Sequence, residues 1–497
     1  MVIRKISYYR VIVSLCLFMF FLSPVFGDEN SAVSFDKELP ENNIVTIQPD
    51  SLRILHNPLT GWVLYASMGV DAADFWAQYD HMYIPELGHN VSVTDYAHTL
   101  YIRASWTDFN PQEDVYGWKI DSNLRAYIEG AYQRNMRLAF RVVVDSRDKR
   151  TEFTPQFVKD AGAKGFMNKG KWSPYSDDPV FQKYYTKFVK ALAKDFNDPS
   201  KVEFIDGFGL GKWGEYHTMI YSTGDDTPKK AVFDWVTDIY SQAFDKVPVV
   251  INYHRWIGAG KDWVDDEHFA ADSEEMLEGA IKKGYSLRHD AFGMTTYYGS
   301  WERRFAKKYR NICPIIMEGG WIVKSHSYWQ DPRGYRKDSH EDVRRGEFDD
   351  SKEAHVNMMD FRFGDTESWF KDAFDLVRRF LREGGYRLYP SEISLPLEVS
   401  KKTTPTIKHC WNNLGWGYCP TNIPQWNQKY KVAFALLDSE TNEVRYTFVD
   451  TDTDLSKWIK GSPVEYVFEP DMSKVETGTY VWAVGLVDRR DRKSTRL

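Results

Sequence analysis

The order of apolar and amphipathic segments is the feature that most constrains the fold of this chain. Within residues 51–386, eight short apolar runs alternate with stretches whose apolar residues recur at helical spacing. This alternation predicts βα units in a parallel sheet, and eight units predict a closed (β/α)8 barrel, since a doubly wound sheet usually needs fewer. The predicted strands span residues 61–66, 99–104, 138–144, 204–210, 248–253, 291–295, 314–317 and 355–361. The predicted helices span residues 121–134, 180–196, 229–243, 273–283, 301–309, 351–354 and 367–383.

The pattern changes after the Gly384-Gly385 pair. Residues 429–437, 443–449 and 479–487 alternate apolar and polar side chains and are separated by turn residues. Such alternation predicts antiparallel strands with one buried face. We therefore predict a barrel over residues 51–386 and an accessory β-sandwich over residues 387–497, preceded by a polar segment over residues 28–50.

The N-terminus predicts export. Arg4, Lys5 and Arg10 precede an apolar run over residues 11–21, and small residues up to Gly27 follow it. This order is typical of a secretion signal, here residues 1–27, and predicts a periplasmic, cell-surface or secreted protein. An uncleaved membrane anchor is the alternative, but the run is shorter than the ~20 residues that a span requires. No transmembrane span is expected after signal cleavage.

Charge and cysteine content exclude several functional classes. The net charge is −7 with acids and bases interspersed, which argues against binding to nucleic acid. Cys410 and Cys419 are close enough in sequence to pair in an oxidising compartment, whereas Cys313 lies in an apolar run and is expected as a buried thiol. The chain has no paired Cys/His set, dinucleotide fingerprint or phosphate loop, so no metal or organic cofactor is expected.

Two glutamates follow predicted barrel strands, where the catalytic groups of such barrels lie. Glu215 follows the fourth strand in the string Gly209-Leu210-Gly211-Lys212-Trp213-Gly214-Glu215-Tyr216-His217, and Glu318 follows the seventh in Pro314-Ile315-Ile316-Met317-Glu318. A carboxylate directly after an apolar strand is costly unless it is paired or functional. Each glutamate alone could be a structural ion-pair partner, but the two together indicate a catalytic pair.

Residues 55–385 resemble clan A of the glycoside hydrolases, barrel enzymes with an acid/base Glu after strand four and a nucleophile Glu after strand seven. The passage from Trp106 through Pro111 to Gly117-Trp118 resembles the β-galactosidase-type families of this clan. The resemblance implies that Glu215 is the acid/base, that Glu318 is the nucleophile, and that Arg103, Tyr297 and Tyr298 support the nucleophile. The chain departs from the clan at Gly214, where an Asn usually binds the 2-hydroxyl of the sugar, and its Trp-Gly-Glu-Tyr-His string resembles an uncommon family of carbohydrate-degrading bacteria.

A retaining glycosidase needs one protonated and one ionised carboxyl at neutral pH. Arg103 beside Glu318 would lower the pKa of this carboxyl, and a tyrosine hydroxyl would hold it in line for attack. Trp213 and Tyr216 would give Glu215 less polar surroundings that retain its proton. The clan implies a carboxyl separation of ~5 Å and therefore retention of anomeric configuration.

Further candidate residues lie in the loops that follow the predicted strands. The chain has 18 Trp and 30 Tyr, more than its core needs, and carbohydrate sites use such rings as stacking surfaces. The candidates for substrate binding are Trp106, Trp213, His217, His254, Trp256, Trp301, Trp321, Lys324 and Arg333. Weaker candidates, for which structural hydrogen bonds are the simpler role, are Asp145, Arg255, Asp360 and Arg362.

The loop after the seventh strand is rich in Lys and Arg between Lys324 and Arg345. Such a run is often a solvated face, but beside a nucleophile it also suits sulfate or carboxylate groups on a glycan. The sequence thus predicts an exported retaining glycosidase that cleaves a β-linked glycan, of β-galactoside type and sulfated or otherwise anionic, as in carrageenan or agar. The alternatives are a non-catalytic carbohydrate-binding barrel and a surface scaffold protein. The oligomeric state is left open.

Overall fold

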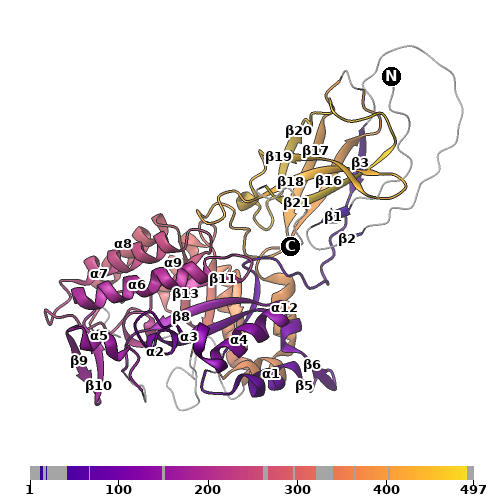
Figure 1. Cartoon of the computed structure of the whole chain (residues 1–497). Helices are drawn as coiled ribbons and strands as arrows, with labels where there is room; N and C mark the ends of the chain where they lie inside the picture. The colour runs from indigo at the N-terminus through magenta and orange to yellow at the C-terminus, as the bar shows by residue number, and fades with distance from the viewer. Residues whose placement is uncertain are drawn as a thin grey trace, which may run out of the picture. The chain divides into compact units, whose positions relative to one another are not determined.

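The computed structural model describes residues 12–14, 18–19, 42–66, 68–147, 151–260, 267–294, 297–320, 340–362, 364–400 and 403–489. The chain divides into two compact units (Figure 1). One comprises residues 58–385 and 423–425, and the other comprises residues 1–57, 386–422 and 426–497.

The first unit is a (β/α)8 barrel with eight parallel strands in a closed ring, as the sequence predicts. Neighbouring strands follow chain order, because each strand returns through a helix to the next position in the ring. The strands are β4 (Gly61–Tyr65), β7 (Ala97–Ser105), β8 (Arg137–Val143), β11 (Val202–Asp206), β12 (Val249–Asn252), β13 (Tyr285–Phe292), β14 (Ile315–Gly319) and β15 (Met358–Asp360).

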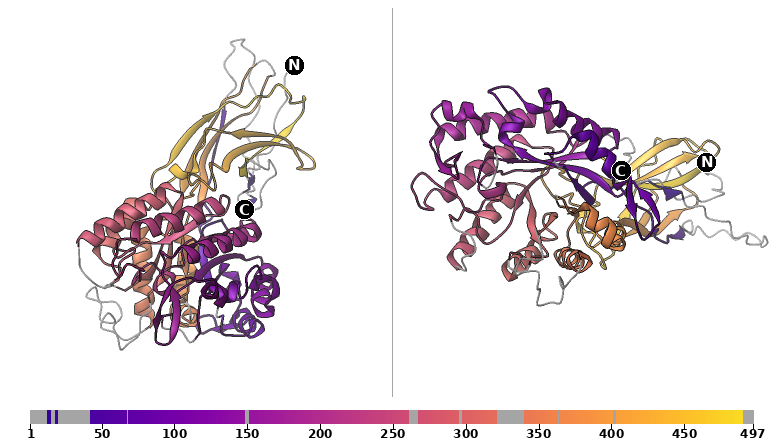
Figure 2. Two further views of the ribbon diagram at one scale, coloured as in Figure 1. Left: turned by 60° about the vertical axis from the view of Figure 1, so that its left-hand side comes forward. Right: turned by 90° about the horizontal axis from the view of Figure 1, so that it is seen from below.

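Helices lie outside these strands (Figure 2). Asp178 caps the longest of them by accepting hydrogen bonds from Val180 and Phe181, and Pro179 occupies the first helical position, where its missing N–H costs nothing. The helices are α1 (Ala72–Asp80), α4 (Ser122–Gln133), α6 (Pro179–Phe196), α7 (Lys229–Ala243), α8 (Glu267–Lys282), α9 (Ser300–Tyr309), α10 (His340–Ala354), α11 (Thr366–Asp372) and α12 (Phe374–Glu383).

Three predicted helices differ from the observed ones, and one of them, predicted over residues 273–283, begins earlier as α8 at Glu267. The helix predicted over residues 351–354 is the last turn of the longer α10, and the single helix predicted over residues 367–383 is interrupted at Ala373 to give α11 and α12. The apolar stripe of α12 packs on the barrel wall, where Phe380 contacts the ring of Trp62 at 5.2 Å between centroids. The amphipathic pattern therefore predicts the buried face of this segment correctly, but it does not reveal the break at Ala373.

The sixth strand begins earlier than predicted. The prediction placed it at residues 291–295, whereas β13 spans Tyr285–Phe292 and pairs with β12 from Val249↔Tyr285 to Asn252↔Arg288. Ser286, Arg288 and Asp290 are polar, so this segment lacks the apolar run by which the other strands were found. The charged residues of β13 nevertheless lie in the barrel interior, and the active-site geometry depends on them.

Short elements decorate the barrel loops. Two hairpins are formed by β5 (Met82–Ile84) with β6 (His89–Val91) and by β9 (Gly165–Asn168) with β10 (Lys171–Pro174). Short helices are α2 (Trp106–Phe109), α3 (Gly117–Ile120), α5 (Gln156–Asp160), η1 (Val93–Asp95) and η2 (Lys212–Gly214). Of these, η2 matters most for function because it leads directly into Glu215.

The second unit is a β-sandwich of two sheets. One sheet has the order β20-β17-β16-β3 and the other the order β19-β18-β21-β1-β2. The ring of His409 on β17 packs against Phe434 on β18 with centroids 5.1 Å apart, which joins the two inner faces. The strands are β16 (Leu388–Pro396), β17 (Ile407–Asn413), β18 (Tyr430–Asp438), β19 (Val444–Asp450), β20 (Val464–Phe468) and β21 (Tyr480–Asp488), with η4 (Leu455–Lys457) between β19 and β20.

N-terminal residues also take part in the sandwich. The segment predicted to be a polar stretch outside both domains contains β3 (Asn42–Thr46), which pairs antiparallel with β16. Within the segment predicted as a secretion signal lie β1 (Ile12–Ser14) and β2 (Phe18–Met19), and β1 pairs with β21. The domain is thus not formed by the C-terminal residues alone, because strand pairing joins segments far apart in sequence.

Three cysteines fall within the described residues, and all three are free thiols. The pairing considered for Cys410 and Cys419 is not formed. Burial raises the pKa of the Cys419 thiol, which interacts with Tyr386, and it also raises the pKa of Cys313, which is buried as expected. In the described part of the chain, no helix is long and apolar enough to cross a membrane, and no cluster of three or more His, Cys, Asp or Glu could hold a metal ion.

Candidate active site

Glu215 lies in the loop that follows β11, the fourth barrel strand. Gly209, Gly211 and Gly214 all have positive φ in this loop, and so does Trp213 at 59°. Glycine adopts this conformation without steric cost, whereas a tryptophan in it is uncommon and is often found at functional sites. The loop thereby folds back on itself and turns the Glu215 side chain toward two arginines of the barrel interior.

Three cationic or imidazole groups contact the Glu215 carboxylate. Its Oε1 lies 3.4 Å from Nη1 of Arg141 on β8 and 3.8 Å from Nη2 of Arg103 on β7. Its Oε2 lies 3.3 Å from Nε2 of His217, whose Nδ1 lies 3.0 Å from the Thr218 hydroxyl. Positive charge and a hydrogen-bonding ring therefore orient Glu215 from opposite sides.

His254 holds the backbone of the same loop. Trp256 N–H donates to Nδ1 of His254, so the other ring nitrogen, Nε2, carries the hydrogen that it donates to the Glu215 carbonyl at 2.8 Å. His217 and His254 are both fully buried. Both were predicted to bind substrate, but the structure places them behind Glu215, where they position its side chain and backbone.

Glu318 lies near the end of β14, the seventh strand, and is buried. Its Oε2 lies 2.6 Å from Nη2 of Arg288 on β13. Burial, together with the nearby charges of Asp290 and Asp360, raises the pKa of Glu318 to about 8 against the opposing charges of Arg288 and Arg141. The expected lowering of this pKa by an arginine is therefore outweighed by burial and by two neighbouring carboxyls.

The arginine that pairs with Glu318 is not the predicted one. Arg103 donates to the Trp213 carbonyl at 2.7 Å and to the Tyr65 hydroxyl at 3.3 Å, and its ion pair is with Glu215. Arg288 occupies the position expected for Arg103 because β13 is the direct neighbour of β14 in the barrel, whereas β7 is not. Arg103 still acts on Glu318 through its charge, but without the predicted direct pairing.

Buried ion pairs cross the barrel interior beneath both glutamates. Arg141 binds Asp206 at 2.5 Å and Asp290 at 2.8 Å, and Arg288 binds Asp360 at 2.6 Å. The guanidinium of Arg288 lies 4.5 Å from the ring centroid of Tyr101 on β7, which stands opposite β13 in the ring of strands. We refer to Arg141, Arg288, Asp206, Asp290 and Asp360 as the buried ion network.

This network brings the two predicted catalytic glutamates to one site. Arg141 contacts Glu215, and its charge also acts on Glu318. Arg103 likewise interacts with both carboxyls. The energy of a pair of charges falls as the distance between them grows, so a guanidinium that acts on both carboxyls lies near both. Glu215 and Glu318 therefore face the same pair of guanidinium groups at the carboxyl ends of the strands.

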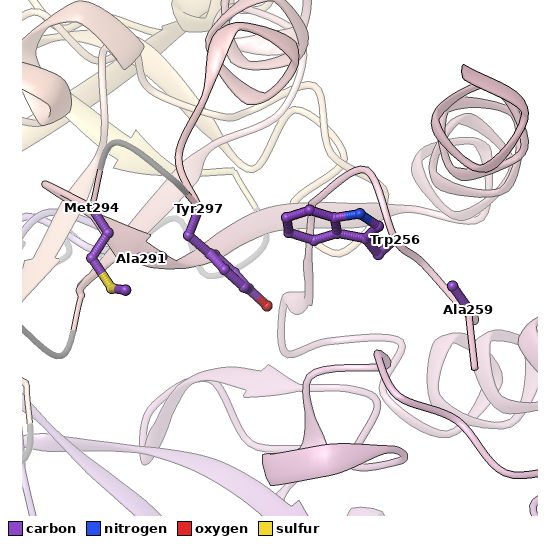
Figure 3. Packing of buried hydrophobic residues seen from close by; sticks show 5 residues of the cluster. All are labelled: Trp256, Ala259, Ala291, Met294 and Tyr297. Carbon is purple, nitrogen blue, oxygen red and sulfur yellow. The ribbon is translucent and has the colours of Figure 1, made fainter. Parts of the chain in front are cut away.

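The two tyrosines predicted to support the nucleophile point to different surroundings. Tyr297 packs with Trp256, Ala259, Ala291 and Met294 (Figure 3), and its ring also lies 6.1 Å from that of His217, on the Glu215 side of the site. Tyr298 stacks on Phe292 and lies 3.5 Å from the Tyr253 hydroxyl, within the packing between strands and helices. The structure thus gives Tyr298 a place in the core, where it cannot hold the nucleophile.

Most of the predicted stacking tryptophans are buried. Trp106 is fully buried among aromatic residues that include Tyr185 and Phe188 of α6, and Trp301 stacks on Phe305 within α9. Trp256 is also buried. Trp213 is partly exposed beside Glu215, and the Lys212 ammonium lies 4.2 Å from its ring centroid. Trp321, Lys324 and Arg333 lie outside the described residues.

The weaker candidates have structural partners, which is the simpler role considered for them. Asp145 pairs with Arg147, and Arg255 binds Glu302 at 2.9 Å. Asp360 accepts a hydrogen bond from the Arg362 backbone and belongs to the buried ion network. Asp360 is therefore the one of these residues that lies next to a predicted catalytic group.

Sequence reasoning missed Arg141, Arg288, Asp206 and Asp290. Arg141 and Asp206 lie inside strands that were predicted, so a charged residue within an apolar run was a usable signal. Arg288 and Asp290 lie in the part of β13 that the prediction left out of the strand. The charged residues that form the site inside the barrel also interrupt the apolar pattern by which β13 would have been predicted.

The glycine that departs from the clan pattern has a structural reason. Gly214 has a φ of +77°, and a Cβ at this position would lie 3.3 Å from Cα of Gly209 and 3.5 Å from Cδ of Arg141. A side chain here would crowd Gly209 in the same loop and would fill the space next to Arg141, which contacts Glu215. The asparagine typical of clan A is therefore disfavoured by the backbone and by the packing.

No family model matches the sequence, and no curated protein matches it. Solved structures that match include a GH30 endoxylanase from Clostridium papyrosolvens, with 9% identity and a TM-score of 0.39 over 84% of this chain and 96% of that chain. Endo-glycoceramidase II from Rhodococcus sp. matches with 12% identity and a TM-score of 0.38 over 83% of this chain and 97% of that chain. An exo-β-1,4-mannosidase from an Opitutaceae bacterium matches with 12% identity and a TM-score of 0.38 over 68% and 58%.

The raised pKa of Glu318 predicts a pH-dependent stability. Folding raises this pKa from 4.5 to about 8, so the folded protein holds the proton more tightly and loses stability as pH rises through that interval. We expect the melting temperature of Glu318→Gln to rise relative to wild type between pH 5 and pH 9, measured by calorimetry. Glu353→Gln, at an exposed ion pair, is the control without this trend. A wild-type protein that gains stability relative to Glu318→Gln at pH 9 would contradict the assignment.

The Gly214 geometry predicts two separable effects of an added methyl group. Gly214→Ala should destabilise the protein by about 1 kcal/mol or more, because alanine is strained at positive φ. It should also lower kcat, because the new Cβ crowds Gly209 and so shifts the loop that carries Glu215. Gly224→Ala is the matched control, since Gly224 has a φ of +78° but nothing within 4 Å of its added Cβ. Denaturation and kinetics on both variants test this, and an equal loss of kcat in the two would refute the packing argument.

Proposed function

We propose that this protein is a retaining glycoside hydrolase that cleaves a β-linked glycan, with Glu318 as nucleophile and Glu215 as acid/base. The observation that carries the proposal is the shared arginine environment of two carboxyls that follow the fourth and seventh barrel strands. Arg141 contacts Glu215 at 3.4 Å and acts on Glu318 by its charge. Two carboxyl groups at one site supply the general acid and the nucleophile of double displacement.

The chemistry requires each glutamate to act twice. Glu318 attacks the anomeric carbon while Glu215 gives a proton to the leaving oxygen, and a glycosyl-enzyme forms. Glu215 then takes a proton from water, which attacks the anomeric carbon and releases Glu318. His217 and His254 hold the side chain and the backbone of Glu215, and such fixed geometry favours both proton transfers.

For the substrate, we propose a β-galactoside-type glycan that carries sulfate or carboxylate groups. Support comes from the loop beside Glu215, where the partly exposed Trp213 offers a ring to the sugar and Lys212 places a cation over that ring. The basic loop after β14 that motivates this proposal lies outside the described residues apart from its end in α10. We further propose that residues 1–27 export the protein to the periplasm, the cell surface or the medium.

A non-catalytic carbohydrate-binding barrel is less well supported. Such a protein would need exposed rings, yet Trp106, Trp256 and Trp301 are buried. It would also have no use for two carboxyls held against buried arginines, since burial of charge costs free energy unless it is compensated. A surface scaffold would not need these carboxyls either.

Substitution of the two glutamates tests the reaction. Glu215→Gln should lower kcat about 10²- to 10⁴-fold on natural β-linked oligosaccharides and much less on aryl glycosides whose leaving group needs no proton. Glu318→Ala should abolish hydrolysis of both substrates. For the wild-type enzyme, NMR should show that the first product retains the anomeric configuration of the substrate. Glu353→Gln is the exposed carboxyl control. Full activity in both active-site variants, or an inverted first product, would rule out the mechanism.

Salt dependence tests the charge of the substrate. Lys212→Met should raise KM about fivefold for a sulfated β-galactan oligosaccharide, the effect of one partly exposed ion contact, without changing KM for the neutral oligosaccharide. Added salt should reduce this difference by screening. Lys190→Met, at an exposed position of α6, is the control. Equal KM values for neutral and sulfated substrates in wild type would exclude an anionic substrate.

A further inference from the structure

One nitrogen of Arg288 binds two carboxyl groups. Its Nη2 lies 2.6 Å from Oε2 of Glu318 and 2.6 Å from Oδ2 of Asp360. The two carboxyls come from β14 and β15, which are neighbours in the barrel. Two oxygens that each lie 2.6 Å from the same nitrogen are separated by no more than twice that distance, so Asp360 is a close neighbour of the proposed nucleophile.

The charges around this pair do not balance. Arg141 and Arg288 are fully buried, and they face five buried carboxyl groups, those of Asp206, Glu215, Asp290, Asp360 and Glu318. Arg141 forms ion pairs with Asp206 at 2.5 Å and with Asp290 at 2.8 Å. Arg288 is then the main partner of both Glu318 and Asp360. Its single charge can compensate only one of them.

The other groups that face Glu318 do not remove this excess. They are Arg288 and Asp290 from β13, Asp360 from β15, Arg141 from β8, Arg103 from β7 and Tyr65 from β4. Arg103 forms its ion pair with Glu215, and Asp290 adds negative charge. Burial raises the pKa of Asp360 as it does that of Glu318. A buried carboxylate without a partner normally takes up a proton.

We propose that Glu318 and Asp360 share one proton beside Nη2 of Arg288, which stays protonated, and that Asp360 is a positioning residue that holds the shared proton while Glu318 attacks. The inference rests on the proposed function for its catalytic part and on the geometry of the pair for the shared proton. It assigns a role to a side chain that does not itself touch the sugar.

The proton transfer balances within the pair. The O–H bond of Glu318 breaks and an O–H bond forms on Asp360, so the pair keeps one proton and one negative charge. The freed carboxylate of Glu318 forms a bond to the anomeric carbon while the glycosidic C–O bond breaks, and the leaving oxygen takes its proton from Glu215. Arg288 stays bonded to both side chains, which keeps Glu318 in line.

Asp360→Asn tests the shared proton because it removes the charge of Asp360 at nearly constant size. With the competing carboxylate removed from Nη2 of Arg288, we expect the acidic limb of the kcat/KM profile to move to lower pH by about one unit or more. Asp360→Glu keeps the carboxyl and should retain the wild-type limb. Asp350→Asn is the matched control, because Asp350 is as deeply buried but pairs with Arg303 at 2.7 Å. A limb that moves no further in Asp360→Asn than in Asp350→Asn would overturn the proposal.

An infrared titration separates this proposal from the proposed function. Wild-type protein should show a carboxyl proton that is lost near pH 8, the pKa of Glu318, and this signal should be absent in both Glu318→Gln and Asp360→Asn. The measurement needs no substrate, so it remains decisive if no glycan is hydrolysed. Loss of the signal in Glu318→Gln alone would show that Glu318 titrates independently and would refute sharing.

Discussion

The burial of two guanidinium groups inside the barrel is the constraint on which the rest of this structure depends. Arg141 and Arg288 are both fully buried, and each requires carboxylates within ion-pair distance to offset its lost hydration. Asp206, Asp290 and Asp360 meet this need from β11, β13 and β15. Strands that are not neighbours in the ring, such as β8 and β13, are thereby joined through their side chains, where most barrels rely on apolar layers.

The same ion pairs prepare the site for chemistry. Glu215 and Glu318 lie at the edge of the buried ion network, and each takes one of its arginines as a partner. Burial and nearby carboxyls raise the pKa of Glu318 to about 8, so its reactivity depends on where one proton resides. An apolar barrel core could not set a protonation state in this way. Burying these charges costs free energy, and the same buried charges set the protonation state on which the proposed function depends.

Sequence reasoning was strongest where apolar patterns carry the signal and weakest where charge replaces them. Seven of the eight strands contain apolar runs that overlap the predicted strands. The sixth strand was predicted too late in the chain, because Ser286, Arg288 and Asp290 interrupt the apolar pattern of β13. The positions of Trp106 and Trp301 after strands predict stacking surfaces, but both side chains are buried. Exposure of an aromatic ring depends on what packs on it, which position in the chain does not reveal.

The sequence by itself determined the alternation of strands and helices, and hence the barrel, together with the places of Glu215 and Glu318 after the fourth and seventh strands. Periodicity carries this information because burial of one face of each element is a local requirement. Only the tertiary structure decided that Arg288 pairs with Glu318, that His217 and His254 stand behind Glu215, and that β3 joins the sandwich. These contacts join residues far apart in sequence, and the free energy of a buried charge depends on all its neighbours at once.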